Sequence, residues 1–325
     1  MHLVDRAAVE AAARVLAGVA RYTPVDEPDA ETGLPSLKRE DLQPVGAFKV
    51  RGAFHAASRL APERRAAGLV THSSGNHGRA VAWTAGRLGV PATVVVPHDA
   101  VEAKVEAMVA LGARLVRVPA DDREATADAE VARTGGALIP PYDHPDVIAG
   151  QGTVGLEILA QVPGVEQVLV PVGGGGLISG IAAALAGRGV AVVGVEPAVA
   201  GDAAESFRVG ERRRWSRARV ASTAADGLRA TSLGALTWEH VRAGVTDVVT
   251  VDEETVEDAA RALHALGVRA EASGAVAVAG WLAHPELRRG RTVAVVSGGN
   301  VDPDWIARVL VPRTPEATAG TTTSG

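Results

Sequence analysis

Residues 168–185 read VLVPVGGGGLISGIAAAL, and this stretch decides the class of fold. Its first five residues are apolar and mostly β-branched, which is typical of a strand buried in a parallel sheet. Four consecutive glycines follow, and after them a run of small apolar residues that is typical of a closely packed helix. A buried strand, a glycine turn and a helix in this order predict a parallel α/β fold.

The glycine turn indicates a phosphate site. Without Cβ atoms, its backbone N–H groups can converge on an anion, and the helix that follows adds its positive dipole end. A dinucleotide site is the alternative, because the next apolar run, Ala191–Val195, ends at Glu196, where a ribose-binding acid could stand. No frame of the run gives G-x-G-x-x-G, since the third glycine would fall on Ile178 or Ser179. The pattern therefore favours a phosphate monoester.

On both sides of this stretch, short apolar runs alternate with alanine-rich helical segments. Asp5 is expected to cap a first helix from Arg6 to about Ala20. Continuous apolar strands that alternate with helices predict parallel sheets. The predicted strands are Gly68–Val70, Ala92–Val96, Arg114–Val118, Val168–Val172, Ala191–Val195, Val248–Val251 and Thr292–Val296.

The composition excludes several classes of function. The chain has 325 residues, a formal net charge of −5 and no cysteine, which excludes disulfides and thiolate chemistry. A mildly negative charge gives no reason to expect nucleic acid or a membrane surface as a partner. With no apolar segment long enough to span a bilayer and no signal-peptide layout, we expect a cytoplasmic enzyme with a small-molecule substrate.

Lys49 is the candidate nucleophile. Basic side chains are almost all arginine, and lysine occurs only at Lys38, Lys49 and Lys104. A nucleophilic amine cannot be arginine, whose guanidinium stays protonated. Lys49 lies between small residues and Phe48, a flank that can desolvate an ammonium and lower its pKa, although a surface lysine that opens a helix is the alternative. An amine nucleophile together with a monophosphate site indicates pyridoxal phosphate.

Several spaced motifs then resemble, in order, the serine/threonine dehydratase and serine racemase family of pyridoxal phosphate enzymes, which have fold type II and are tryptophan synthase β-like. The resemblance extends from about Tyr22 to Trp305. The motifs are LKREDLQP (37–44) running into FKVRGA (48–53), THSSGNHG (71–78), GQGT (150–153), GGGG (173–176) and SGGNVD (297–302).

The resemblance implies two doubly wound parallel-sheet domains with the cofactor in the cleft between them. Residues 1–54 and 139–325 would form the large cofactor-binding domain, and residues 55–138 a small domain inserted in it. A homodimer is expected. The feedback-regulated threonine dehydratases carry an added C-terminal domain, which is not expected here, because few residues follow the Ser297 motif.

The resemblance also assigns residues to the cofactor. Lys49 would hold it covalently and act as the base on one face of the substrate Cα. Phe48 would pack against the ring, Asn76 would bind the ring hydroxyl and Ser297 would meet the ring nitrogen. The backbone of Gly173, Gly174, Gly175, Gly176 and Leu177 would bind the phosphate.

For the substrate, the resemblance points to the loop with Ser73, Ser74, Asn76 and His77, which would take the carboxylate, and to Arg123. Serine racemases carry a serine at the position of Ser74 as the acid on the opposite face of Cα, whereas many dehydratases carry alanine there. His77 is assigned no proton transfer.

Two further sites are considered by resemblance. Glu196, the Ala200 carbonyl and Asp202 resemble a divalent-cation site, whose oxygen ligands suit magnesium or calcium; a strand end followed by a capped helix is the alternative. Asn300 matches a nucleotide contact of animal serine racemases, but Val45 and Gly267 replace polar or charged residues there. Nucleotide activation is therefore not expected.

These observations predict a pyridoxal phosphate-dependent threonine/serine ammonia-lyase. Serine racemase or 3-hydroxyaspartate dehydratase activity is the first alternative, and a non-catalytic pyridoxal phosphate-binding protein is the second. The sequence does not rank threonine, serine and hydroxyaspartate as substrates.

Overall fold

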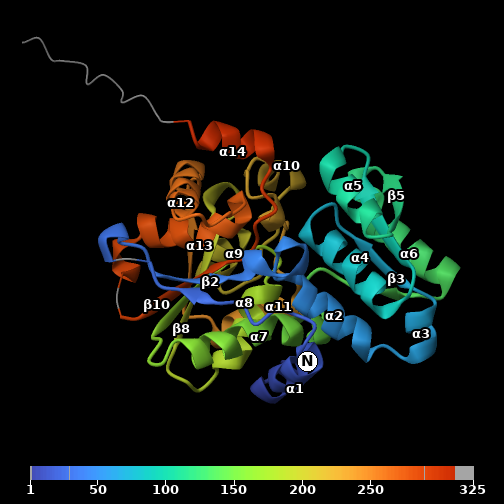
Figure 1. Ribbon diagram of the computed structural model, residues 1–325, viewed down its shortest axis with the longest axis horizontal. Helices are drawn as coiled ribbons and strands as arrows, with labels where there is room; N and C mark the ends of the chain where they lie inside the picture. The colour runs from blue at the N-terminus through green and yellow to red at the C-terminus, as the bar shows by residue number, and fades with distance from the viewer. Residues whose placement is uncertain (1, 29, 289, 312–325) are drawn as a thin grey trace, which may run out of the picture.

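The computed structural model describes residues 2–28, 30–288 and 290–311, which fold around two sheets (Figure 1). The larger sheet has the strand order β1-β2-β10-β7-β8-β9, with β1 antiparallel to β2 and the other neighbours parallel. Its strands are β1 Val25–Asp26, β2 Ser36–Arg39, β7 Gln167–Pro171, β8 Ala191–Pro197, β9 Asp247–Val251 and β10 Thr292–Val296.

The smaller sheet has the order β5-β4-β3-β6 and all its pairs are parallel. Its strands are β3 Leu69–His72, β4 Ala92–Pro97, β5 Arg114–Val118 and β6 Ala137–Leu138. The predicted strands and the α/β class with two parallel-sheet units are confirmed. The domain boundaries at residues 54/55 and 138/139 stay a prediction, although the smaller sheet lies wholly between residues 69 and 138.

Three strands were not predicted. β1 and β6 have only two residues each, too few for an apolar run. β2 carries Lys38 and Arg39 where an apolar strand would carry valine or leucine. Lys38 is nevertheless fully buried, because its ammonium is paired inside the molecule.

The helices surround both sheets, and none of those in the described residues is long and apolar enough to span a bilayer. Asp5 caps α1 as predicted, accepting from the Ala8 N–H at 2.8 Å. The helix ends at Leu16 rather than near Ala20, because the chain leaves helical geometry at Ala17 and turns. The helices are α1 Arg6–Leu16, α2 Lys49–Arg59, α3 Pro62–Ala66, α4 Asn76–Leu88, α5 Glu102–Ala110, α6 Arg123–Thr134, α7 Pro145–Gln161, α8 Gly176–Leu185, α9 Asp202–Val209, α10 Arg217–Val220, α11 Ala235–Gly244, α12 Glu253–Ala265, α13 Ala272–Ala283 and α14 Pro303–Val309.

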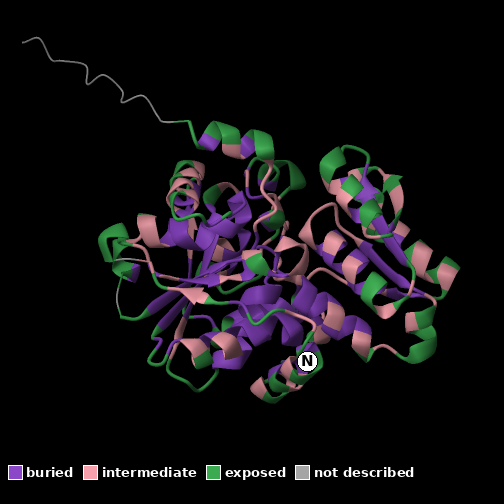
Figure 2. Cartoon of the chain, in the orientation of Figure 1, coloured by how far each residue is buried: buried purple, intermediate pink, exposed green. Residues whose placement is uncertain are grey.

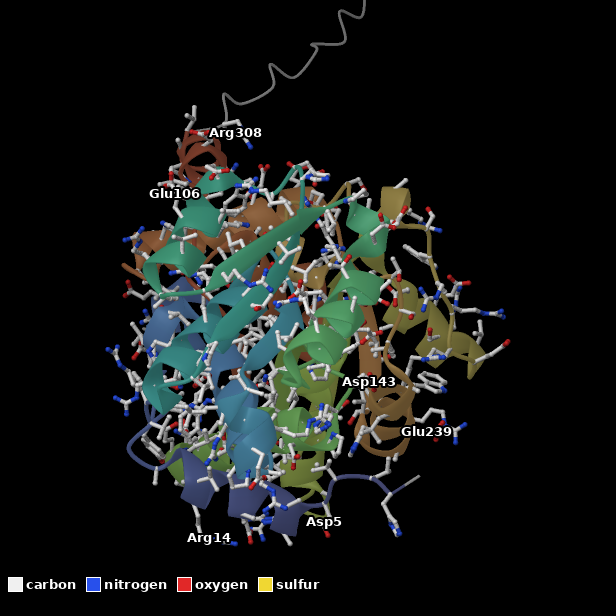
Figure 3. The ribbon with its side chains drawn as sticks, turned by 90° about the vertical axis from the view of Figure 1, so that its right-hand side faces the viewer. Asp5, Arg14, Glu106, Asp143, Glu239 and Arg308 are labelled. Carbon is white, nitrogen blue, oxygen red and sulfur yellow. The ribbon has the colours of Figure 1, made fainter. Side chains whose placement is uncertain are left out.

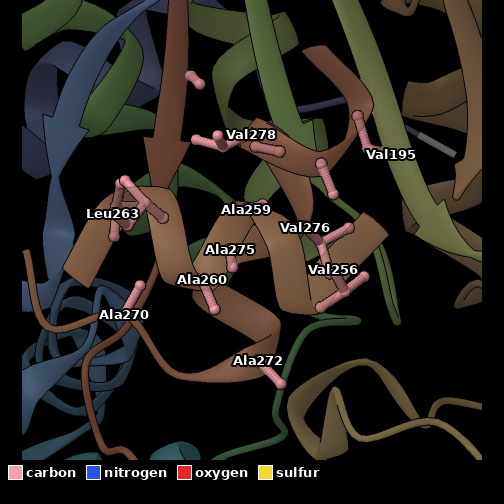
Figure 4. Close-up of a cluster of buried hydrophobic side chains, with 14 of the residues drawn as sticks. Val195, Val256, Ala259, Ala260, Leu263, Ala270, Ala272, Ala275, Val276 and Val278 are labelled. Atoms are coloured by element: carbon pink, nitrogen blue, oxygen red, sulfur yellow. The ribbon is translucent and has the colours of Figure 1, made fainter. Parts of the chain in front are cut away.

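Side chains that alternate along the strands of the larger sheet fill two separate cores. Val168 and Val170 of β7 pack with α7, α8 and α11, whereas Leu169 between them packs with α12 and α13. Figure 4 shows the second core, where Val195 of β8 lies beside the small side chains of α12 and α13. Both faces of the sheet are covered, so its strands β7, β8 and β10 are almost wholly buried (Figure 2). This explains why the strands read as continuous apolar runs.

The GQGT motif at residues 150–153 belongs to α7 and serves helix packing. A Cβ on Gly152 would lie 2.6 Å from the carbonyl oxygen of Gly180 in α8, so the two backbones are in direct contact. Gln151 accepts a hydrogen bond at 3.1 Å from the N–H of Gly52 in α2. The motif therefore fixes α2, the helix that Lys49 opens, against α7.

A buried ion cluster joins α2 to β2 and α7. The Arg51 guanidinium, 1% exposed, donates to Glu40 at 2.7 and 2.8 Å and to Glu157 at 2.6 and 2.9 Å. The Lys38 ammonium donates to Glu157 at 2.6 Å. Burial alone would raise the pKa of Glu40, but the charge and hydrogen bonds of Arg51, together with Lys38 and Thr23, outweigh burial and hold that pKa below its usual value. Two cations and two carboxylates thus balance in the interior.

Replacing Arg51 should destabilise the protein strongly. Arg51→Leu leaves two buried carboxylates without their main cation, so the free energy of unfolding should fall by about 3–5 kcal/mol. Denaturant unfolding measures this change.

Arg59→Leu, on the same helix, is the matched control. The Arg59 side chain is 65% exposed and 3.8 Å from Asp146, so its loss should cost below about 1 kcal/mol. Equal losses in the two variants would show that the buried cluster does not stabilise this junction.

Candidate active site

Lys49 opens α2, the helix that packs against α7 of the larger unit and α4 of the smaller one (Figure 1). The segment before it is held to the end of β10, because Ala47 forms an isolated bridge with Gly298 and the Phe48 N–H donates to the Ser297 carbonyl at 3.2 Å. The Lys49 ammonium donates to the Pro141 carbonyl at 2.8 Å and lies 5.0 Å from the centre of the Phe48 ring. These contacts bring Phe48, Lys49 and the Ser297 segment together, and their roles toward the cofactor stay a prediction.

The three lysines differ in their partners. Lys38 lies in the buried ion cluster, and Lys104 forms an ion pair with Asp226. Lys49 has no carboxylate within ion-pair distance among the described residues. Burial lowers its pKa to about 8, so a substantial share of the amine is neutral near physiological pH. The structure therefore singles out Lys49 as the amine suited to nucleophilic and base chemistry.

The glycine loop lies between the end of β7 and the start of α8. Gly175 is the residue before the helix and has φ +90°, a conformation that favours glycine. The first N–H groups of a helix lack intrahelical acceptors, so those of Gly176 and Leu177 can serve an anion at this positive end. This geometry fits the predicted phosphate site.

Packing also requires these glycines. A Cβ on Gly174 would overlap the Tyr142 ring, and a Cβ on Gly175 would lie 2.7 Å from Leu233. A Cβ on Gly173 would lie 3.0 Å from the Leu228 Cα, and one on Gly176 would lie 3.0 Å from the Tyr142 Cβ. Substitution in the loop would disturb folding as well as any bound phosphate, so it cannot test the site cleanly.

Tyr142 connects Lys49 to the glycine loop, and sequence reasoning missed it. It follows Pro141, which accepts from Lys49, and its ring lies against Gly174. The next residue, Asp143, caps α11 by accepting from three N–H groups at 2.8 to 3.1 Å, and Figure 3 labels both Asp143 and Glu239 of that helix. Tyr142 is one of two tyrosines in the chain, a signal that could have drawn attention to it.

Asn76 lies at the start of α4 and reaches across to the larger unit. Its Nδ2 donates to Glu271 at 2.6 Å, and its Oδ1 accepts from Asn300 at 2.7 Å. A Cβ on Gly298 would lie 3.2 Å from Asn76 Nδ2, so Asn76 sits beside the Ser297 segment. The Ser297 side chain is buried, and its hydroxyl makes a long 3.4 Å hydrogen bond to the Ser273 carbonyl.

The loop at residues 73–77 connects β3 to α4. The Ser73 hydroxyl accepts from the Gly75 N–H at 3.2 Å and so shapes the turn, while the Ser74 hydroxyl has no partner among the described residues. His77 is buried and its Nε2–H donates to the Ile139 carbonyl at 2.9 Å. Burial, with the nearby Lys49 charge, lowers the pKa of His77 to about 3, so the ring is neutral. This agrees with assigning it no proton transfer.

Arg123 opens α6, and its Nε donates to the Ala120 carbonyl at 2.9 Å. Burial lowers the pKa of His72, and the Arg123 charge lowers it further, which places Arg123 near the end of β3 where the loop begins. No hydrogen bond joins it to Lys49 or Ser74 within the described chain. Its role in substrate binding stays a prediction.

Glu196 and Asp202 form a buried acidic pair at the end of β8 and the start of α9. Glu196 Oε2 accepts from the Ala204 N–H at 2.8 Å, but Glu196 Oε1 and Asp202 Oδ2 are buried without a partner. Burial and the neighbouring Asp202 raise the pKa of Glu196 well above its usual value, and burial raises the pKa of Asp202 to about 7. Ala200 lies fully buried between them.

The orphaned oxygens of this pair fit a cation. No larger cluster of acidic, histidine or cysteine side chains suited to a metal occurs in the described ranges. A cation here would therefore need backbone carbonyl or water oxygens as further ligands, as magnesium and calcium accept.

The donor set as a whole fits pyridoxal phosphate. A buried amine with a lowered pKa, a helix N-terminus behind a glycine turn, an amide and a buried hydroxyl come from segments far apart in the chain.

Comparisons with known proteins indicate the family of the chain. The model of the family described as pyridoxal-phosphate dependent enzyme matches residues 18–298. L-threo-3-hydroxyaspartate ammonia-lyase of Saccharomyces cerevisiae is 43% identical over 274 residues, 82% of each chain. Serine racemase of Arabidopsis thaliana is 42% identical over 277 residues, also 82% of each chain. The crystal structure of T.th. threonine deaminase has a TM-score of 0.85 at 40% identity, covering 92% of this chain and 99% of that one.

Pyridoxal phosphate added to the protein and then reduced with borohydride should modify Lys49. Its amine has no ion-pair partner among the described residues, whereas Lys38 and Lys104 are engaged in ion pairs with Glu157 and Asp226. Peptide mass mapping identifies the modified residue, and Lys49→Arg should remove the label. A label chiefly on Lys38 or Lys104 would overturn the assignment.

Proposed function

Because this chain belongs to the family of pyridoxal-phosphate dependent enzymes, we propose that it is an ammonia-lyase that converts L-threonine or L-serine to an α-keto acid and ammonia. One observation carries the proposal: Lys49 is a buried amine with a pKa of about 8 and no carboxylate partner among the described residues. Such an amine can both bind a carbonyl carbon and accept a proton from Cα.

Each residue has a defined task in this reaction. When bound, pyridoxal phosphate supplies an electron sink for the negative charge that develops at Cα. Lys49 Nζ takes the α-proton. Asn76 would hold the ring hydroxyl and Ser297 would meet the ring nitrogen. A hydroxyl at Ser297, rather than a carboxylate, would leave that nitrogen largely neutral, which would favour prompt loss of the β-hydroxyl.

The loop at residues 73–77 supports the substrate carboxylate. Its backbone N–H groups lie at the start of α4, where the helix dipole favours an anion. Ser73 shapes the turn through its bond to Gly75, and the neutral His77 anchors the loop to Ile139. Ser74 is left free to face the substrate.

Ser74 favours racemase activity as the second candidate. A hydroxyl without a structural partner can act as an acid on the face of Cα opposite Lys49. Serine and hydroxyaspartate stay candidate substrates, because relatives of this chain are named serine racemase and L-threo-3-hydroxyaspartate ammonia-lyase. The third possibility, a non-catalytic binding protein, is disfavoured because Lys49, Ser74 and Asn76 are all present.

The acidic pair of Glu196 and Asp202 supports a magnesium or calcium site. Two buried carboxylates with orphaned oxygens destabilise the folded state when both are ionised. They must therefore either bind protons or be neutralised by a cation. The Ala200 carbonyl is the third ligand in this proposal.

A product screen tests the function. The protein with pyridoxal phosphate is incubated with L-threonine, L-serine and L-threo-3-hydroxyaspartate, and keto acid and ammonia are measured. We expect equal amounts of keto acid and ammonia from at least one substrate, and a loss of about 1,000-fold or more in Lys49→Ala, since the base is removed. Cofactor binding without turnover on all three substrates would contradict the lyase assignment.

Ser74→Ala separates elimination from racemisation. Wild type should make mainly keto acid with measurable D-serine. The variant should lose D-serine formation and D-serine breakdown, while L-serine elimination falls by less than about tenfold, since Lys49 alone serves that face. Chiral chromatography measures both products. An equal loss of both activities on L-serine would make Ser74 a carboxylate-binding residue instead.

Removing divalent cations should lower the melting temperature. Chelator is expected to reduce it by several degrees and magnesium or calcium to restore it, because a ligand that binds only the folded state stabilises that state. In Glu196→Gln both responses should vanish. If chelator leaves the melting temperature of wild type unchanged, the segment is only a strand end followed by a capped helix.

A further inference from the structure

Glu271 is a buried carboxyl group at the site to which the residues named so far assign no task. It precedes α13 and is 5% exposed. Its N–H donates to the Gly298 carbonyl at 3.1 Å, and a Cβ on Gly298 would overlap Glu271 Oε1. The side chain therefore lies directly against the backbone that follows Ser297.

Glu271 and Asn300 hold Asn76 from its two ends. Glu271 Oε1 accepts from Asn76 Nδ2 at 2.6 Å, and Asn300 Nδ2 donates to Asn76 Oδ1 at 2.7 Å. Asn300 is itself fixed, because the same nitrogen donates to the Val45 carbonyl at 2.8 Å. A flipped Asn76 amide would place donor against donor at Asn300, so the network selects one orientation.

This orientation leaves one Asn76 N–H available. The amide nitrogen carries two hydrogens, and Glu271 uses one of them. The second can serve the cofactor hydroxyl to which Asn76 is assigned. An unsupported asparagine would have to be ordered when the cofactor binds, and ordering a side chain weakens binding.

Burial keeps the Glu271 carboxyl mostly protonated at neutral pH. Burial and, to a smaller extent, Asp226 raise its pKa, whereas Asn76, Lys104 and Arg79 lower it, and the net pKa is about 8. Lys104 is occupied by its ion pair with Asp226. Glutamine therefore has both the shape and the charge of Glu271 as it stands at neutral pH.

We propose that Glu271 is a positioning residue for cofactor binding: it orients the Asn76 amide by the 2.6 Å hydrogen bond, while Asn300 holds the other end. The proposal rests on the assigned role of Asn76 as a cofactor contact. It does not depend on which amino acid the enzyme converts.

A double-mutant cycle measured on cofactor affinity tests the proposal. Pyridoxal phosphate is titrated into the cofactor-free full chain without substrate, and visible absorbance gives Kd. Glu271→Leu should raise Kd about tenfold, while Glu271→Gln, which keeps an acceptor oxygen, should stay within about threefold of wild type. In an Asn76→Ala background, Glu271→Leu should change Kd by less than about twofold.

Glu166→Leu is the control for a lost glutamate. Glu166 accepts from the Arg291 N–H at 3.2 Å just before β7, at the opposite end of that strand from the glycine loop. The Kd of the Glu166→Leu variant for the cofactor should match that of wild type. Two results would overturn the proposal. One is that Glu271→Leu raises Kd by the same factor in the wild-type and the Asn76→Ala backgrounds. The other is that Glu271→Gln binds the cofactor as weakly as Glu271→Leu.

A pH series keeps the proposal testable if Glu271→Leu fails to fold. Well below pH 8 the Glu271 carboxyl is mostly protonated and resembles glutamine, so wild type and Glu271→Gln should bind alike. Above pH 8 the ionised carboxylate repels the anionic cofactor, so the ratio of wild-type to variant Kd should rise severalfold by about pH 9. Lys49 titrates in the same pH range in both proteins, so its effect on Kd cancels in the ratio. Weaker binding by Glu271→Gln than by wild type below pH 8 would contradict the proposal, because glutamine keeps the acceptor oxygen. Cofactor binding as expected without ammonia-lyase activity would contradict only the proposed function.

Discussion

The buried contact between Arg51 and the carboxylates of Glu40 and Glu157 is the constraint on which the site depends. Arg51 lies two residues after Lys49, so fixing its guanidinium fixes the first turn of α2. Burying two ion pairs gains little net stability over apolar packing, because desolvation offsets the attraction. The cluster instead fixes the position of α2, which can pack against β2 and α7 in only one way. The position of Lys49, the first residue of α2, is fixed as a result.

Close backbone packing is the second constraint, and it explains the composition. Where α7 crosses α8, Gly152 and Gly180 touch, and no larger residue would fit. The core is therefore built from alanine, valine and glycine, and aromatic residues make up 3% of the chain. The scarcity of large side chains follows from helices that lie near one another and near the sheet.

Sequence reasoning succeeded where one local pattern decides the outcome. Apolar runs gave the long strands, and the strand–glycine–helix stretch gave the loop before α8, because burial on both faces leaves a readable signature. It missed β2, whose Lys38 is buried only because Glu157, far along the chain, pairs with it. Tyr142 and Glu271 were missed for the same reason. Their importance comes from neighbours in space, Gly174 and Asn76, which no short motif contains.

The buried carboxyl groups show how environment, not residue type, sets a role. Glu40 faces Arg51 and stays ionised, since the cation holds its pKa low despite burial. Glu271 faces an amide and another acid, so burial raises its pKa to about 8 and it keeps its proton. Glu196 faces Asp202, and the pair has oxygens with neither cation nor donor among the described residues. Of the three environments, this one alone leaves buried carboxylate oxygens, Glu196 Oε1 and Asp202 Oδ2, without a partner among the described residues. A divalent ion would satisfy both carboxylates at once, which is the physical case for a cation at the end of β8.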